Sequence, residues 1–153
     1  MRVEITNAEY ADLKHVSNNM RELDKREVRE IGGLTPADAV FHSALISRDV
    51  RAARIDGVAV AVFGESRTNG GDTSVLWLLG TDDLMRGRFA YIREANKYIA
   101  QIRGEGCRIE NVVHEDNEPS IRLLEALGFE FGEAEDTAHG GRGVRFWMES
   151  SDV

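Results

Sequence analysis

Two apolar runs separated by an amphipathic segment constrain the fold of this chain most strongly. The runs are Val75–Leu79 and Ile109–Val113. Each is typical of a strand that is covered on both faces, as in the middle of a sheet. Between them, apolar residues recur at steps of three and four over Asp82–Arg103, which predicts a helix that Gly104 closes. The three segments therefore form a β-α-β unit, whose strands should run parallel.

The rest of the chain supplies further strand and helix signals. Asp56-Gly57 favours a two-residue hairpin turn, because such turns need positive φ. Thr6 and Thr35 are each followed by an acidic residue three positions on, which is the spacing of a helix N-cap, and Pro36 directly follows Thr35. The other expected strands are Arg2–Ile5, Val50–Ile55, Val58–Phe63, one that starts at Phe129, and Val144–Met148. A length of 153 residues with 42% hydrophobic content fits a single domain, residues 1–153.

Charge and cysteine content exclude several classes of partner. The formal net charge is −8 and no basic block is present, which argues against nucleic-acid binding and against anionic membranes. No apolar run reaches transmembrane length, and none resembles a signal peptide. Cys107 is the only cysteine, so it cannot form an intramolecular disulfide. We therefore expect a reducing, cytoplasmic location, with Cys107 as a structural residue.

Functional residues are expected where the two central strands end, because ligands gather there in parallel sheets. This places the site at Leu79–Arg88 and His114–Ser120. His114 and Glu115 are candidate bases. The alternative is that they are solvated strand-end residues, with Asn117 capping the next helix. The four histidines are scattered singly, which argues against a metal site.

A resemblance to a known family rests on the run from Asn117 to Phe129. An Asn, a small residue three positions on (Ser120), and a helix ending in Leu-Gly-Phe resemble the late motif of the GCN5-related N-acetyltransferase (GNAT) superfamily. The element order is also similar to that family. The resemblance implies an α/β fold with a mixed, mostly antiparallel sheet of six to seven strands, a parallel β-α-β core, and helices on both faces.

The same resemblance implies an acyl-CoA donor, such as acetyl-CoA, and an amine acceptor. In that family the two central strands splay apart, and we expect a gap past Leu79 and Val113. The resemblance assigns donor binding to Leu78, Leu79, Gly80, Arg86, Gly87, Arg88, Asn117 and Ser120. It assigns catalytic roles to His114, Glu115 and Asn117. It also places Arg21–Glu30 beside the acceptor, whereas the mixed charges of that segment by themselves favour a solvated helix face.

Three departures from the family pattern accompany this resemblance. Phe89 and Tyr91 stand where the phosphate loop has small residues. Asp82 and Asp83, expected at the helix start, should repel phosphate. Leu124 replaces a tyrosine that many active members use as an acid, with Tyr91 or Tyr98 as substitutes.

A narrower resemblance bears on the origin of the chain. Trp77-Leu78-Leu79-Gly80-Thr81 is similar to acetyltransferase-like internal virion or assembly proteins of short-tailed bacteriophages. It implies a phage or host protein partner and a location in host cytoplasm. Two functions thus stay open, an acyl-CoA-dependent N-acyltransferase and a catalytically silent assembly or host-binding protein.

Overall fold

The protein forms one seven-stranded sheet in a computed structural model that describes residues 1–151, apart from the side chains of Arg88 and Phe89. The strand order is β1-β2-β3-β4-β5-β7-β6. The strands are β1 (Val3–Asn7), β2 (Arg48–Ile55), β3 (Val58–Thr68), β4 (Thr73–Gly80), β5 (Arg108–His114), β6 (Glu130–Asp136) and β7 (Arg142–Met148). The helices are α1 (Tyr10–Asn18), α2 (Glu22–Gly32), α3 (Pro36–Ile46), α4 (Arg88–Gly104) and α5 (Glu118–Ala126).

The predicted β-α-β unit is confirmed. β4, α4 and β5 follow one another along the chain, and β4 pairs with β5 in parallel. The other neighbouring strands pair antiparallel. The expected mixed, mostly antiparallel sheet is therefore the one observed.

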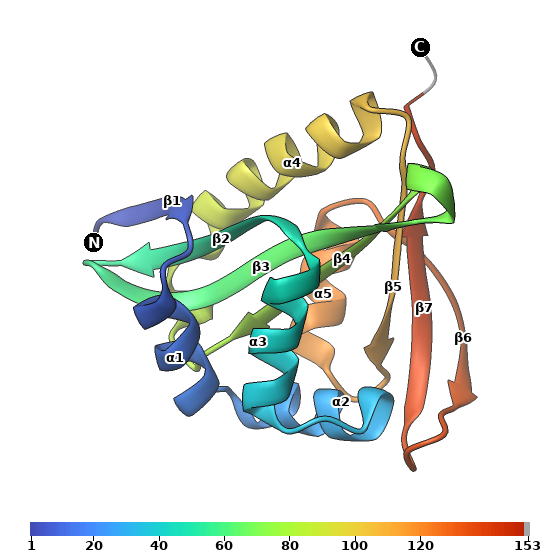
Figure 1. Ribbon diagram of the computed structural model, residues 1–153, viewed down its shortest axis with the longest axis horizontal. Coiled ribbons are helices and arrows are strands. Elements are labelled where there is room, and N and C mark those ends of the chain that lie inside the picture. The colour runs from blue at the N-terminus through green and yellow to red at the C-terminus, as the bar shows by residue number, and fades with distance from the viewer. Residues whose placement is uncertain (152–153) are drawn as a thin grey trace.

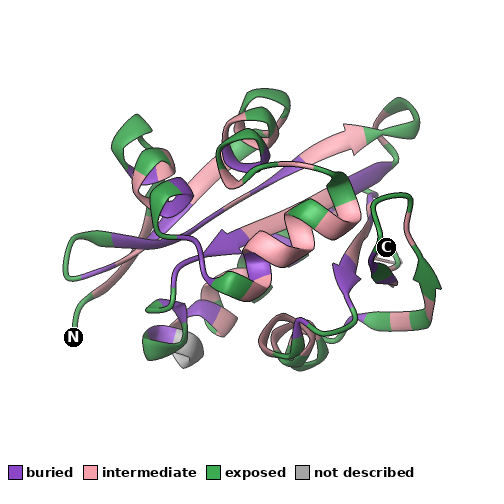
Figure 2. Ribbon diagram, turned by 90° about the horizontal axis from the view of Figure 1, so that it is seen from below, coloured by how far each residue is buried: buried purple, intermediate pink, exposed green. Residues whose placement is uncertain are grey.

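Helices cover both faces of this sheet. α1 and α3 lie on one face, and α4 and α5 lie on the other (Figure 1). Figure 2 shows buried segments of the strands between these layers. Under α1 and α3 the core contains Val16, Val40 and Val62, whereas Ile99 and Ile109 belong to the core beneath α4.

α2 has a different place from the other four helices. In Figure 1 it lies below the arrowheads of β4 and β5, and in Figure 2 it crosses in front of the sheet. Its contacts include β5, β7 and α3. α2 therefore covers the carboxyl ends of the two parallel strands, where the sequence places the site.

Two of the three predicted turn and cap signals are confirmed. Asp56 and Gly57 have φ of 50° and 84°, as the hairpin turn between β2 and β3 requires. The Thr35 hydroxyl accepts a hydrogen bond from the Asp38 N–H at 3.2 Å. The N-cap predicted at Thr6 is wrong, because α1 begins three residues later, after Glu9. There Glu9 and Asp12 form the reciprocal capping box.

The helix predicted to begin at Asp82 begins instead at Arg88. A 3₁₀ turn, Leu84–Gly87, occupies the intervening segment. The Thr81 hydroxyl accepts a hydrogen bond from the Asp83 N–H just before this turn, and the backbone bond from the Arg86 N–H to the Asp83 carbonyl lies within it. Gly87 is then the N-cap of α4, so Asp82 and Asp83 lie outside its first turn.

Candidate functional site

The two parallel strands separate along most of their length. They pair only between Thr73–Val75 and Arg108–Glu110. Beyond that, the Asn111 side chain spans the opening: its Nδ2 donates to the Leu76 carbonyl at 2.8 Å, and its Oδ1 accepts from the Val112 N–H. The fork therefore opens earlier than the predicted point past Leu79 and Val113.

The β4 edge that faces the fork has one open peptide position. Alternate residues of a strand direct their N–H and C=O groups to the same side. On this side, Leu76 is held by Asn111, and Gly80 donates to Asp24 and accepts from the Arg21 N–H. Leu78 lies between them, and the described residues supply no partner for it across the fork. An open N–H of this kind can bind a carbonyl oxygen.

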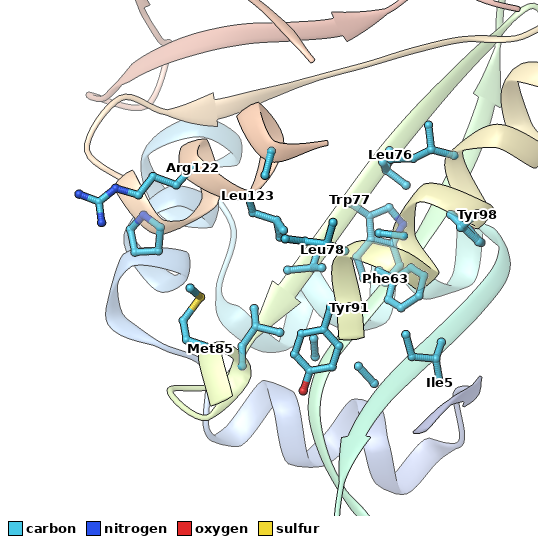
Figure 3. Close-up of a pocket in the computed structure, with 18 residues that line it drawn as sticks. Ile5, Phe63, Leu76, Trp77, Leu78, Met85, Tyr91, Tyr98, Arg122 and Leu123 are labelled. Atoms are coloured by element: carbon cyan, nitrogen blue, oxygen red, sulfur yellow. The ribbon is translucent and has the colours of Figure 1, made fainter. Parts of the chain in front are cut away.

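Two hollows meet at the fork, one on each face of the sheet. The hollow beneath α4 and α5 has a volume of about 350 Å³. The hollow beneath α2 and α3 has a volume of about 260 Å³. Leu76, Trp77, Leu78 and Leu123 line both, so the two hollows adjoin through the fork. Figure 3 shows Leu123 of α5 directed toward Leu78 of β4 in the α4/α5 hollow.

A row of polar residues three apart on α2 closes the end of the fork. We call Arg21, Asp24, Glu27 and Glu30 the α2 polar row. Asp24 is fully buried; its Oδ2 accepts from the Gly80 N–H at 2.8 Å and pairs with the Arg21 Nε at 2.9 Å. Its Oδ1 accepts from the Asn117 Nδ2 at 3.0 Å. The prediction that this segment is a solvated helix face is therefore wrong for Arg21 and Asp24, which are 8% and 0% exposed.

Glu27 is the member of the row that enters the α2/α3 hollow. Its Oε1 accepts from the His114 N–H at 2.7 Å and from the Asn117 Nδ2 at 3.3 Å. Its Oε2 accepts no hydrogen bond from the described residues. Burial, with a further contribution from neighbouring Asp24, raises the pKa of Glu27 to about 7 despite those two bonds. Glu27 can therefore take up a proton near neutral pH.

Of the three predicted catalytic residues, His114 and Asn117 contact Glu27, whereas Glu115 has other surroundings. The buried His114 ring accepts from the Asp116 N–H at Nδ1, so Nε2 carries the proton that it donates to Glu30 at 3.0 Å. The Glu30 pKa is lowered to about 2, first by this hydrogen bond and then by Arg26. Glu115 is exposed and pairs with Arg142.

Asn117 connects the row to the start of α5. It is 1% exposed, and the capping bond expected of it is absent from α5; its amide instead holds the carboxylates of Asp24 and Glu27. Its Oδ1 has no partner among the described residues. Ser120, one turn further on, accepts from the Arg21 Nη2 at 2.8 Å and lines the α2/α3 hollow.

The predicted donor-binding residues fall into two groups. Leu78 faces the fork, while Leu79 lines the α2/α3 hollow and Gly80 is held by α2. Gly87 is buried at the N-cap of α4, where a Cβ would lie 2.8 Å from the Tyr91 hydroxyl. Arg86 is exposed and 3.8 Å from Asp83. The Arg88 side chain lies outside the described part of the chain.

Asp82 and Asp83 do not lie at the start of α4, where they were expected to repel phosphate. The first turn of α4 contains no acidic residue, so the expected repulsion at that helix end is wrong. Its free N–H groups leave a positive helix end beside Gly87.

Leu124, at the position of the missing tyrosine, and the two substitute acids, Tyr91 and Tyr98, differ in whether a side-chain hydroxyl is available to a ligand. Leu124 lines the α2/α3 hollow. Tyr98 donates its hydroxyl to the Asp49 carbonyl at 3.2 Å, and burial raises its pKa. Tyr91 lines the α4/α5 hollow, its hydroxyl has no partner among the described residues, and burial raises its pKa to about 12. Tyr91 is therefore the tyrosine that stays protonated and free.

The described residues, 1–151, give no support for a metal site, a reactive cysteine or a membrane-spanning helix. No group of three or more His, Cys, Asp and Glu side chains there could hold a metal ion. Cys107 is buried, with its sulfur 2.9 Å from the Arg67 Nη1 and 3.1 Å from the Gly71 carbonyl. No described helix is long and apolar enough to cross a membrane.

Comparisons with known proteins agree on the fold. No family model and no curated protein matches the sequence. Among solved structures, YncA of Salmonella typhimurium, solved with its cofactor acetyl-CoA, has a TM-score of 0.69 at 14% identity, covering 100% of this chain and 96% of that one. The ribosomal-protein-S18-alanine N-acetyltransferase of Escherichia coli gives 0.66 at 15% identity, with coverage of 99% and 96%.

A third similar structure is described as a member of the GNAT family. An acetyltransferase of the GNAT family from Bacillus anthracis has a TM-score of 0.69 at 13% identity, covering 99% of this chain and 97% of that one. Identities this low establish the architecture alone. This chain therefore has the fold of the GCN5-related N-acetyltransferases.

Proposed function

We propose that the protein is an acyl-CoA-dependent N-acyltransferase that acts on an amine. The observation that carries this proposal is the pair of hollows joined through the β4/β5 fork, with the Glu27 carboxylate on one side. Transfer between two substrates needs their reacting atoms to meet while each is held separately. The fork offers such a meeting point beside Leu78, between a hollow on each face of the sheet.

The α4/α5 hollow suits the donor. Its walls are mostly apolar, and one end adjoins the start of α4. There Arg86, Gly87 and the open helix end supply charge and N–H groups for phosphate. Bound acyl-CoA would supply an activated thioester carbonyl at the fork. The Leu78 N–H could bind the carbonyl oxygen and stabilise the negative charge that develops on it.

Glu27 acts as the base in this proposal. An acceptor amine arrives protonated and must lose a proton before its nitrogen can attack. The unoccupied Oε2 accepts that proton, while the His114 N–H and Asn117 hold Oε1 in place. The nitrogen then attacks the thioester carbon, the carbon–sulfur bond breaks, and the sulfur leaves as a thiolate. The acylated nitrogen still carries one extra proton, which the thiolate takes up, so that the products are an amide and a free thiol. A thiol has a pKa of about 8.5, so Leu124 in place of a tyrosine does not prevent this departure.

Glu27→Gln tests the proposal. In the wild-type protein, the rate of thiol release from acetyl-CoA with an amine should rise with pH and level off above an apparent pKa near 7. The variant should lose at least about a hundredfold in rate, the lower range of general-base contributions, together with this pH dependence.

The matched control for this variant is Glu22→Gln. Glu22 is exposed on the same helix and, among the described residues, pairs with Lys25 alone, so its variant should retain the wild-type profile. A Glu27→Gln protein with an unchanged pH profile would show that the base is another group. If calorimetric titration with millimolar acetyl-CoA released or absorbed no heat, the proposal that acetyl-CoA is the acyl donor would be rejected.

The alternative is a catalytically silent protein of this fold that serves virion assembly or binds a host protein. Leu124 supports it, because a leucine cannot donate a proton where many active members of the family that this chain resembles have a tyrosine. In that case the protein should capture a phage or host protein from an infected lysate and bind no acyl-CoA. Turnover of acetyl-CoA that Glu27→Gln abolishes would exclude this alternative.

A further inference from the structure

The chemistry of the α2/α3 hollow limits which amines can occupy it. Among the described residues that line it, Glu27 is the only one with an ionisable side chain. Most of the wall is apolar and includes Val28, Ile31, Leu34 and Phe146. One carboxylate in an apolar wall favours one cationic group on an apolar body.

The polar atoms of the wall are mostly engaged elsewhere. The Ser120 hydroxyl accepts from Arg21, and both ends of the Asn111 amide are held by backbone groups. The Trp77 Nε1 donates to the Ser47 hydroxyl at 2.7 Å. Ser43 is the other polar residue of the described lining. For a second polar group on the acceptor, the described wall therefore offers only neutral groups, such as the Ser43 and Ser120 hydroxyls and the open Leu78 peptide.

A carboxylate on the acceptor would meet no cation in the hollow. The nearby Arg21 does not line the hollow; its Nε lies 2.9 Å from the Asp24 carboxylate, which balances its charge, and its Nη2 donates to Ser120. A free amino acid would place its carboxylate in an apolar wall beside Glu27, which costs desolvation and like-charge repulsion. A polyamine would place a second ammonium group where no second carboxylate lines the wall.

We propose, on the basis of the function above, that the acceptor is a small primary amine on an apolar body without a carboxylate, such as an arylalkylamine. The volume of about 260 Å³ lies below the range of drug-sized ligand sites, roughly 300–1,000 Å³, which fits a compact body. The amine meets Glu27, and the apolar body contacts the wall that Val28, Ile31 and Leu34 provide.

Four matched amines test the proposal: phenethylamine, L-phenylalaninamide, L-phenylalanine and spermidine. We expect kcat/KM with acetyl-CoA to be at least about tenfold higher for phenethylamine and L-phenylalaninamide than for the other two. Preference for phenethylamine supports a small free amine as the acceptor, whereas preference for L-phenylalaninamide over phenethylamine would indicate a peptide N-terminus and overturn the small amine. Equal or better use of L-phenylalanine or spermidine would overturn the inference while leaving the N-acyltransferase function intact.

A designed change in the wall gives a second test. Ser43→Lys adds an ammonium group to the hollow from α3, where Ser43 is partly exposed. It should shift the preference toward L-phenylalanine, relative to phenethylamine, by about tenfold. Leu45→Lys is the control, because Leu45 is on the same helix, is 83% exposed and does not line the hollow. An unchanged preference in Ser43→Lys would count against the proposed orientation.

Binding measured without acetyl-CoA separates the inference from the proposed function. Phenethylamine should shift NMR signals of Val28, Ile31 and Leu34 in the protein alone. If these shifts occur and acetyl-CoA gives no binding heat, the N-acyltransferase function fails and the amine site stands. If acetyl-CoA binds and phenethylamine shifts no signal from the wall, the amine site is rejected.

Discussion

Glu27 shows at the scale of one residue how the proposed function and the stability of the fold oppose each other. Burial holds its pKa near 7, which suits a base but makes its charged form costly in the folded state. The unfolded chain ionises this carboxyl at about 4.5, so the folded protein loses stability as pH rises from there to about 7. Below about 4.5 both states are protonated and no cost arises.

Glu27→Gln should therefore stabilise the protein at alkaline pH. The gain should be absent near pH 4, grow by up to roughly 1.4 kcal/mol per pH unit between the two pKa values, and be complete above about pH 7. Urea unfolding at pH 4.5 and pH 8 measures it. A variant less stable than wild type at pH 8 would mean that the carboxylate has a partner that the described contacts lack.

Asn111 is a second residue whose effect can be isolated, because no other side chain among the described residues spans the opening of the fork. Asn111→Ala leaves the Leu76 carbonyl and the Val112 N–H without these bonds. We expect a loss of about 1–3 kcal/mol in the free energy of unfolding, the cost of partly buried groups left unpaired. Asn96→Ala, on the exposed side of α4, should cost nothing. An equal loss of unfolding free energy in Asn111→Ala and Asn96→Ala would show that the Asn111 side chain does not stabilise the separated strands.

At the scale of the element, α2 acts as a bridge rather than as a solvated helix. Arg21, Asp24 and Glu27 recur at steps of three and so lie on one side of the helix. Arg21 and Asp24 reach the end of β4, Glu27 reaches the end of β5, and all three contact the start of α5. The hydrophobic residues of α2 could be read from the sequence. The direction of its polar face could not, because its partners Gly80, His114 and Asn117 are distant in sequence.

Asp24 is the residue on which the attachment of α2 depends most. Asp24→Ala leaves the Gly80 N–H, the Arg21 guanidinium and the Asn117 amide without their shared acceptor. We expect a loss of about 3–5 kcal/mol in unfolding free energy, as for other buried pairs deprived of one partner. Glu22→Ala, exposed on the same helix, should change stability by less than about 0.5 kcal/mol. A small loss in Asp24→Ala would mean that water or another donor replaces these contacts.

At the scale of the whole molecule, ligand binding should connect the two faces of the sheet. If acetyl-CoA occupies the α4/α5 hollow of the folded state only, a concentration of 100 times its Kd should add about 2.7 kcal/mol to the unfolding free energy. Calorimetric melting with increasing acetyl-CoA measures this. Adenosine 3′,5′-bisphosphate, which carries phosphates without the pantetheine arm, should give a smaller rise. An equal rise with both would place recognition at the start of α4 alone.

The sequence by itself determined the β-α-β unit, the Asp56-Gly57 hairpin and the cap at Thr35, because these depend on periodicity and on residues close together in the chain. It also predicted a site at the ends of β4 and β5, which is where the Glu27 side chain enters the α2/α3 hollow. Only the tertiary structure decided that the strands separate after Val75, that α4 begins at Arg88, and that Glu27 rather than an exposed Glu115 enters the hollow. The physical reason is that strand separation and the pKa of a carboxyl depend on burial and on partners far away in sequence, which a local pattern does not contain.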